Sequence, residues 1–122
     1  MKIAVTAQGN DLDAQMDPRF GRCAAFLVVD TETMAFEVIA NANVTAGGGA
    51  GIQSAQLMAE QDVTAVLTGN CGPNAFRTLE AANITVITGI NGVIRDVVTQ
   101  FKDGELSATK DATVGSHFGM SS

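Results

Sequence analysis

The second half of the chain alternates between helical and strand-like patterns, and this alternation restricts the possible folds more than any other feature. Residues 51–61 repeat apolar side chains at helical spacing, and residues 63–68 are rich in β-branched side chains. A second helix is predicted to begin at Pro73, a strand to span 84–88, and an amphipathic helix to follow over 93–101. Such alternation is typical of parallel strands joined by helices.

The first part of the chain contains three further strand-like segments. These are residues 2–6, 24–30 and 36–40, and a loop rich in Gly, Asn, Asp and Pro occupies 7–22. A βββαβαβα order with right-handed crossovers predicts a mixed five-stranded sheet in order 3-2-1-4-5, with helices on both faces. This is a ribonuclease H-like, three-layer α/β/α architecture, in which the first, fourth and fifth strands are parallel.

The length of 122 residues fits one domain. We assign residues 1–106 to a single domain and the polar residues 107–122 to a flexible tail. No apolar run approaches the roughly 18 residues that a membrane span requires, and Met1 leads directly into a strand-like segment. We therefore expect a cytoplasmic protein that has no membrane partner. We also expect a monomer, although the sequence has no strong sign of oligomeric state.

The net charge argues against nucleic-acid binding, and the cysteine spacing argues against a structural zinc site. The net charge is −6 and the pI is about 4.4, which disfavours nucleic acid as a partner. Cys23 and Cys71 are far apart in sequence, and neither a CxxC motif nor the Cys/His spacing of a structural zinc site occurs. The two cysteines are expected to be reduced thiols.

Four connections are predicted to meet at one edge of the sheet: residues 7–22, 41–51, 69–73 and 89–92. Ligands of open α/β sheets bind outside the carboxyl ends of parallel strands, where the connections diverge. In this topology that point lies between the first and fourth strands. The sequence therefore predicts a ligand site there.

The predicted edge combines glycine-rich segments, helix N-termini and arginines. Residues 47–51 and 70–73 each lead into a helix whose N-terminus favours anions, and Arg19 and Arg22 add positive charge. Simpler interpretations remain open at this point. The glycines can form an ordinary turn, the arginines can pair with the acidic residues of the same loop (Asp11, Asp13 and Asp17), the cysteines can be buried apolar residues, and His117 can be solvated in the tail.

Three motifs, at residues 18–22, 48–53 and 72–76, resemble those of the dinitrogenase iron–molybdenum cofactor biosynthesis family, which includes NifX-like carriers. The likeness extends from Met1 to about Leu106 and is strongest for the orange protein branch, which holds a molybdenum–copper sulfide cluster. The resemblance implies a non-catalytic carrier of this cluster, with an iron–molybdenum or iron–sulfur cluster as the alternative. Proteins that donate or accept the cluster would be its partners.

The resemblance also implies that charge and packing hold the cluster, without a full set of protein ligands to the metals. The residues expected to line the site are Arg19, Phe20, Gly21, Arg22, Gly47, Gly48, Gly49, Gly51, Asn70, Cys71, Gly72 and Asn91. Cys23 and Cys71 stand where small or apolar residues are common in the family. Either a thiolate contact or two harmless substitutions would explain this departure.

Two other functions compete with cluster carriage as interpretations of the sequence. A metal-dependent phosphoester hydrolase needs carboxylates on the central strands, but residues 3–7 contain none and the fourth strand ends at Thr68. The glycine run also lacks the GK[ST] ending of a P-loop. A thiol-based redox or regulatory module would use Cys23 and Cys71, although neither a CxxC motif nor an activating base accompanies them.

Overall fold

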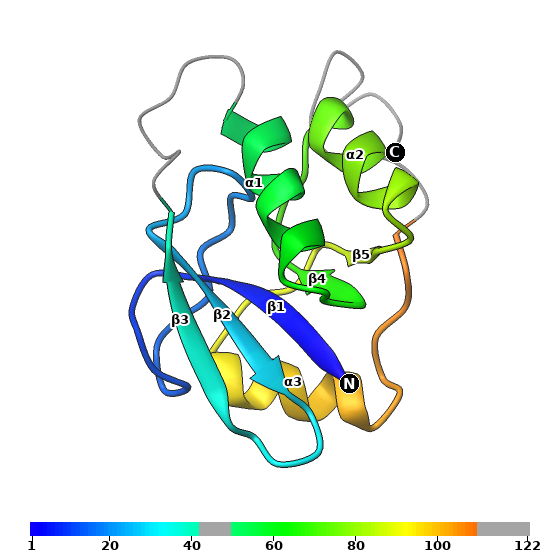
Figure 1. The fold of residues 1–122 in the computed structure, drawn as a ribbon. Coiled ribbons are helices and arrows are strands. Elements are labelled where there is room, and N and C mark those ends of the chain that lie inside the picture. The colour runs from blue at the N-terminus through cyan, green and yellow to red at the C-terminus, as the bar shows by residue number, and fades with distance from the viewer. Residues whose placement is uncertain (42–49, 110–122) are drawn as a thin grey trace.

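The computed structural model describes residues 1–41 and 50–109 (Figure 1). The predicted residues Gly47, Gly48, Gly49 and His117 lie outside these ranges. The elements in chain order are β1 (Lys2–Ala7), β2 (Ala25–Asp30), β3 (Phe36–Ala40), α1 (Ala50–Glu60), β4 (Ala65–Leu67), α2 (Pro73–Ala81), β5 (Thr85–Ile87) and α3 (Ile94–Lys102).

The strands form one mixed sheet in the order β3-β2-β1-β4-β5, which confirms the predicted topology. β2 pairs antiparallel with both β1 and β3, whereas β1, β4 and β5 are mutually parallel. Val5 of the central strand lies opposite Leu27 on one side and Leu67 on the other. This ribonuclease H-like arrangement places the carboxyl ends of β1, β3, β4 and β5 at the same edge.

Helices cover both faces of the sheet, α1 and α2 on one face and α3 on the other (Figure 1). Ala4 of β1 belongs to the core under α1 and α2, whereas Ile3 and Val5 belong to the core under α3. Successive strand residues point to opposite faces, so a central strand covered on both sides is apolar throughout. This explains why β1 shows no polar alternation.

α1 and α2 pack closely because a glycine lies at their contact. A Cβ atom on Gly51 would lie 3.3 Å from the Cβ of Ala75, a tight contact that the glycine avoids. Met58 of α1 and Leu79 of α2 are fully buried beneath this contact. The predicted apolar stripes are confirmed in part. Ala55 and Met58 of α1 pack in the core with Ala75, Phe76 and Leu79 of α2, whereas the predicted Ala59 and Ala82 are exposed.

β4 and β5 are shorter than the predicted segments 63–68 and 84–88. The backbone pairing nevertheless continues beyond β4, because the Thr68 N–H donates to the Ile87 carbonyl at 3.0 Å. Beside β5, the Thr109 N–H donates to the Val86 carbonyl at 2.7 Å. The first residues of the predicted polar tail thus run beside β5.

Candidate anion-binding site

The long loop after β1 returns across the carboxyl edge of the sheet and is fastened there by backbone hydrogen bonds. The Asp17 N–H donates to the Thr6 carbonyl at 2.9 Å, and the Thr6 hydroxyl donates to the Asp17 carbonyl at 2.6 Å. The Thr6 hydroxyl is also hydrogen-bonded to the hydroxyl of Thr68 at 3.0 Å. The ends of β1 and β4 therefore fix the position at which the arginine-bearing segment begins.

The next residues of this loop pair with the connection that follows β4. The Asn70 N–H donates to the Pro18 carbonyl at 2.7 Å, and the Phe20 N–H donates to the Asn70 carbonyl at 3.0 Å. Gly69 permits this approach, because a Cβ atom there would lie 2.8 Å from both Cα and O of Pro18. The fold thus brings the predicted residues Arg19 and Asn70 side by side, as a parallel bridge between them shows.

The loop is also tied to the segment that leads into α3. The Met16 N–H donates to the Gly92 carbonyl at 2.9 Å, and the Ile94 N–H donates to the Ala14 carbonyl at 3.0 Å. Three of the connections predicted to converge therefore do so in the described structure: residues 7–22, 69–73 and 89–92.

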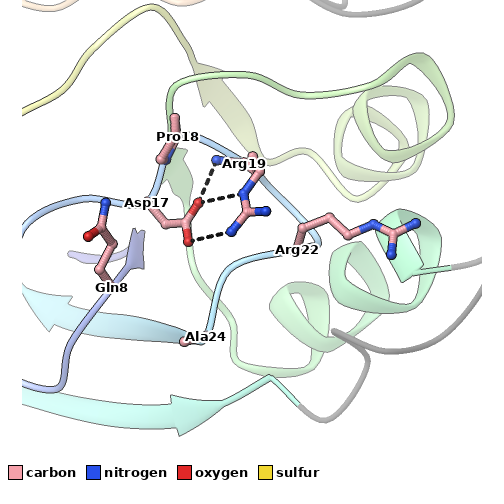
Figure 2. Close-up of a pocket in the computed structure, with 6 residues that line it drawn as sticks. All are labelled: Gln8, Asp17, Pro18, Arg19, Arg22 and Ala24. Carbon is pink, nitrogen blue, oxygen red and sulfur yellow. Dashed lines mark hydrogen bonds and ion pairs between the residues drawn. The ribbon is translucent and has the colours of Figure 1, made fainter.

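An open pocket of about 700 Å³ lies at this edge (Figure 2). Its lining residues come from the loop after β1 and from the approach to β2: Gln8, Asp17, Pro18, Arg19, Arg22 and Ala24. Of the predicted site residues, Arg19 and Arg22 are in this lining. The other lining residues were not predicted.

Asp17 holds Arg19 in place. The Asp17 carboxylate accepts hydrogen bonds from the Arg19 backbone N–H at 2.9 Å, from Nε at 3.2 Å and from Nη2 at 3.3 Å. The Asp17 side chain is 6% exposed and the Arg19 side chain 63%. This hydrogen bond and the charge of Asp17 raise the pKa of Arg19. One of the simpler interpretations, pairing of an arginine with an acid in its own loop, is thus correct for Arg19.

Arg22 is differently placed. It is exposed, and its side chain extends away from the Asp17–Arg19 pair (Figure 2). Within residues 1–41 and 50–109, no carboxylate forms an ion pair with it. Arg22 therefore contributes a positive charge at the pocket that no described acid neutralises.

The turn between the two arginines and β2 is shaped by Gly21 and a buried amide. Gly21 has φ of 93°, a conformation that side chains disfavour. The Asn41 side chain is buried and donates to the carbonyls of Gly21 at 3.1 Å and Cys23 at 2.9 Å. Asn41 was missed by the sequence reasoning, because a single Asn after a strand gives no signal of burial.

Both cysteines are fully buried in the core beneath α1 and α2. Burial raises the pKa of each thiol from 9.0 to about 12, and the charge of Asp17 adds to the effect at Cys23. A thiol is a metal ligand and nucleophile only as thiolate. Both side chains are buried in the core and neither lines the pocket described above, which favours the harmless-substitution interpretation.

The remaining predicted residues fall outside the pocket lining. Phe20 is buried, with its ring centroid 5.6 Å from that of Phe26. Gly72 is the N-cap residue of α2, which has no side-chain cap, and Asn91 is exposed before α3. Gly51 lies at the contact between α1 and α2.

In the described parts of the chain, no three His, Cys, Asp or Glu side chains gather in a way that would hold a metal ion. None of the helices described there is long and apolar enough to cross a bilayer.

The fold and the site define a small α/β protein with an arginine-lined pocket at the carboxyl ends of its parallel strands. The profile of the dinitrogenase iron–molybdenum cofactor family matches residues 1–104. The chain belongs to this family.

Several proteins are similar to this chain in sequence, and the solved structures among them also have a similar fold. The apo form of the orange protein from Desulfovibrio gigas is 44% identical, with a TM-score of 0.90, over 93% of this chain and 96% of that one. A Thermotoga protein described as a putative NifB protein is 31% identical, with a TM-score of 0.76, over 88% and 91% of the two chains. An uncharacterized protein of Methanocaldococcus jannaschii is 31% identical over 87% of this chain and 89% of its own length.

Proposed function

We propose that this protein binds and carries an anionic metal–sulfur cluster, without catalysing a reaction, in the pocket between Gln8 and Ala24. The observation that carries the proposal is the exposed Arg22, which lines the pocket and has no acidic partner among the described residues. Membership of the dinitrogenase iron–molybdenum cofactor family supports it.

The chemistry of the lining suits a bulky, sulfur-rich anion. Arg22 supplies charge, the Gln8 amide and the outer N–H groups of Arg19 supply hydrogen-bond donors, and Pro18 and Ala24 supply apolar surface. A volume of about 700 Å³ falls in the range of small-molecule sites. Such a pocket can retain a cluster by charge and packing.

The molybdenum–copper sulfide cluster implied by the resemblance is the first candidate, and 44% identity to the orange protein supports it. An iron–molybdenum or iron–sulfur cluster is the alternative, which the family description supports. Exchange of the cluster with donor or acceptor proteins in the cytoplasm is part of the same proposal. A thiol-based redox role has less support, because burial raises the pKa of both thiols to about 12.

The test is reconstitution with tetrathiomolybdate and copper, followed by desalting, visible spectroscopy and metal analysis. The chain has no Trp and no Tyr, so a bound chromophore stands out. We expect retained colour at a fixed ratio of metal to protein. Arg22→Glu should weaken retention about tenfold or more, because it replaces attraction by repulsion next to the anion.

The matched control is Lys102→Glu, which changes the net charge equally at the far end of α3, in the last turn of that helix. It should retain the cluster like the unmodified protein. Colourless, metal-free protein would count against a carrier of this cluster. If Arg22→Glu and Lys102→Glu retain the cluster equally, the cluster does not bind in this pocket.

A further inference from the structure

The two outermost strands of the sheet, β3 and β5, differ in what pairs with their outer sides. Beside β5, the Thr109 N–H donates to the Val86 carbonyl and the Thr109 hydroxyl accepts from the Thr88 N–H at 2.9 Å. β3 pairs with β2 on one side, and none of the described residues pairs with its other side. An open strand edge presents backbone donors and acceptors that another strand can pair with.

The open strand also exposes apolar side chains. Phe36 is 41% exposed and Val38 is 40% exposed, and among the described residues only Met1 is another large apolar side chain exposed in this way. Phe36 lies opposite the buried Val29, and Val38 opposite the buried Leu27. Phe36 and Val38 therefore extend the apolar face that α3 covers elsewhere.

The chain segment that contains this strand has acidic side chains only, although Lys2 and the N-terminal ammonium group of the chain lie near Asp30. Residues 23–41 contain Asp30, Glu32 and Glu37 but no Lys or Arg. Glu37 is exposed and, by strand alternation, points to the face opposite Phe36 and Val38. A strand that fits this edge thus has apolar side chains on one face and basic side chains on the other.

A second copy of this chain fits less well. It would bring the same acidic side chains to the edge, and each chain has a net charge of −6. A basic partner is instead attracted to this edge, and complementary charge also accelerates its association.

The carboxyl end of β3 leads to the pocket. Ala40 lies opposite Ala25, and the Asn41 N–H donates to the carbonyl of Ala24, which lines the pocket. A strand added to β3 would therefore reach the rim of the site.

We propose that β3 is the docking edge for an extended segment of a partner protein in which apolar and basic residues alternate. This interaction surface goes beyond the proposed cluster carriage and does not depend on it. Backbone pairing would supply affinity, and the contacts to Phe36, Val38 and Glu37 would supply selectivity.

The test uses a short synthetic peptide of alternating Val and Lys, titrated into the isotope-labelled protein at low ionic strength and followed by NMR. We expect chemical-shift changes and slowed amide exchange that centre on β3. A peptide with Glu in place of Lys should bind at least about fivefold more weakly, because it faces Glu37. Glu37→Lys should reverse this preference without altering the fold, since Glu37 is exposed.

Three results would overturn the proposal: shifts that centre on another element, equal binding of the two peptides, or unchanged preference in Glu37→Lys. Self-association through β3 in sedimentation experiments would assign the edge to a second copy instead. Cluster retention is measured on the same variant and should be unchanged. Loss of peptide binding and loss of cluster binding are thus separate outcomes.

Discussion

Replacing Asp17 by Asn should make the pocket bind anions more tightly. The Asp17 carboxylate lies in the pocket lining and occupies the Nε and Nη2 groups of Arg19. Asparagine retains an oxygen that can accept from the Arg19 backbone N–H, so the loop geometry should survive. The substitution removes a negative charge and releases the donors of Arg19.

The size of the effect follows from the charges. Two unit charges about 6 Å apart in a water-like medium interact by roughly 0.7 kcal/mol. For a dianion such as tetrathiomolybdate the repulsion removed is about 1.4 kcal/mol, which corresponds to about tenfold in affinity. The gain should shrink at high ionic strength, because salt that enters the open pocket screens a bound anion from the charges around it.

The assay is titration with tetrathiomolybdate at low and high ionic strength, with Asp13→Asn as the matched control. Asp13 belongs to the same loop, but its side chain is 74% exposed, it pairs with Arg95 at 3.0 Å and it does not line the pocket. We expect Asp13→Asn to change the affinity by less than about twofold. If Asp17→Asn instead binds more weakly than this control, Asp17 positions Arg19 as a ligand and the reasoning is refuted.

Three further predictions concern residues that stabilise the loops around the pocket or lie buried in the core. Gly69→Ala should lower the free energy of unfolding by about 1–3 kcal/mol in a denaturant titration, because its Cβ would clash with the Pro18 backbone. Asn41→Ala should cost about 1–3 kcal/mol in the same titration, because two buried carbonyls lose their donor. Stability should fall as the pH rises from 9.0 to about 12, because the folded state keeps the Cys23 and Cys71 thiols protonated while the unfolded chain releases those protons. Replacing both cysteines by Ala should flatten this decline and preserve cluster retention.

Each of these predictions has an outcome that contradicts it. If Gly69→Ala leaves the free energy of unfolding unchanged, the connection after β4 does not pack closely against the Pro18 backbone. Asn41→Asp, which cannot donate, should be at least as destabilising as Asn41→Ala, and a stable Asp variant would exclude the buried amide bridge. If the variant without cysteines loses cluster retention, the thiols of Cys23 and Cys71 contribute to cluster binding.

The topology was predictable because it depends on periodicity. The alternation of strand and helix after Gly51 requires parallel pairing, and the uninterrupted apolar segment at Ile3 requires burial on both faces. Convergence of the loops at one edge then follows from the strand order. The sequence therefore predicts that Arg19 and Arg22 lie at the same end of the sheet.

The lining of the pocket was less predictable, because it depends on contacts between side chains. Sequence spacing places Asp17 two residues from Arg19 but does not show that Asp17 is buried and binds it. The family resemblance implied that Cys71 lines the site, whereas its side chain is buried in the core. Gln8 and Ala24 gave no signal, since neither residue type marks a ligand site.

The most direct test is a crystal structure of the protein loaded with tetrathiomolybdate and copper, with diffraction data collected at the molybdenum absorption edge. Our account predicts an anomalous peak in the pocket, close to the guanidinium of Arg22 and to the Asp17–Arg19 pair. A peak beside the buried sulfur of Cys23 or Cys71, or one on another face of the molecule, would contradict it.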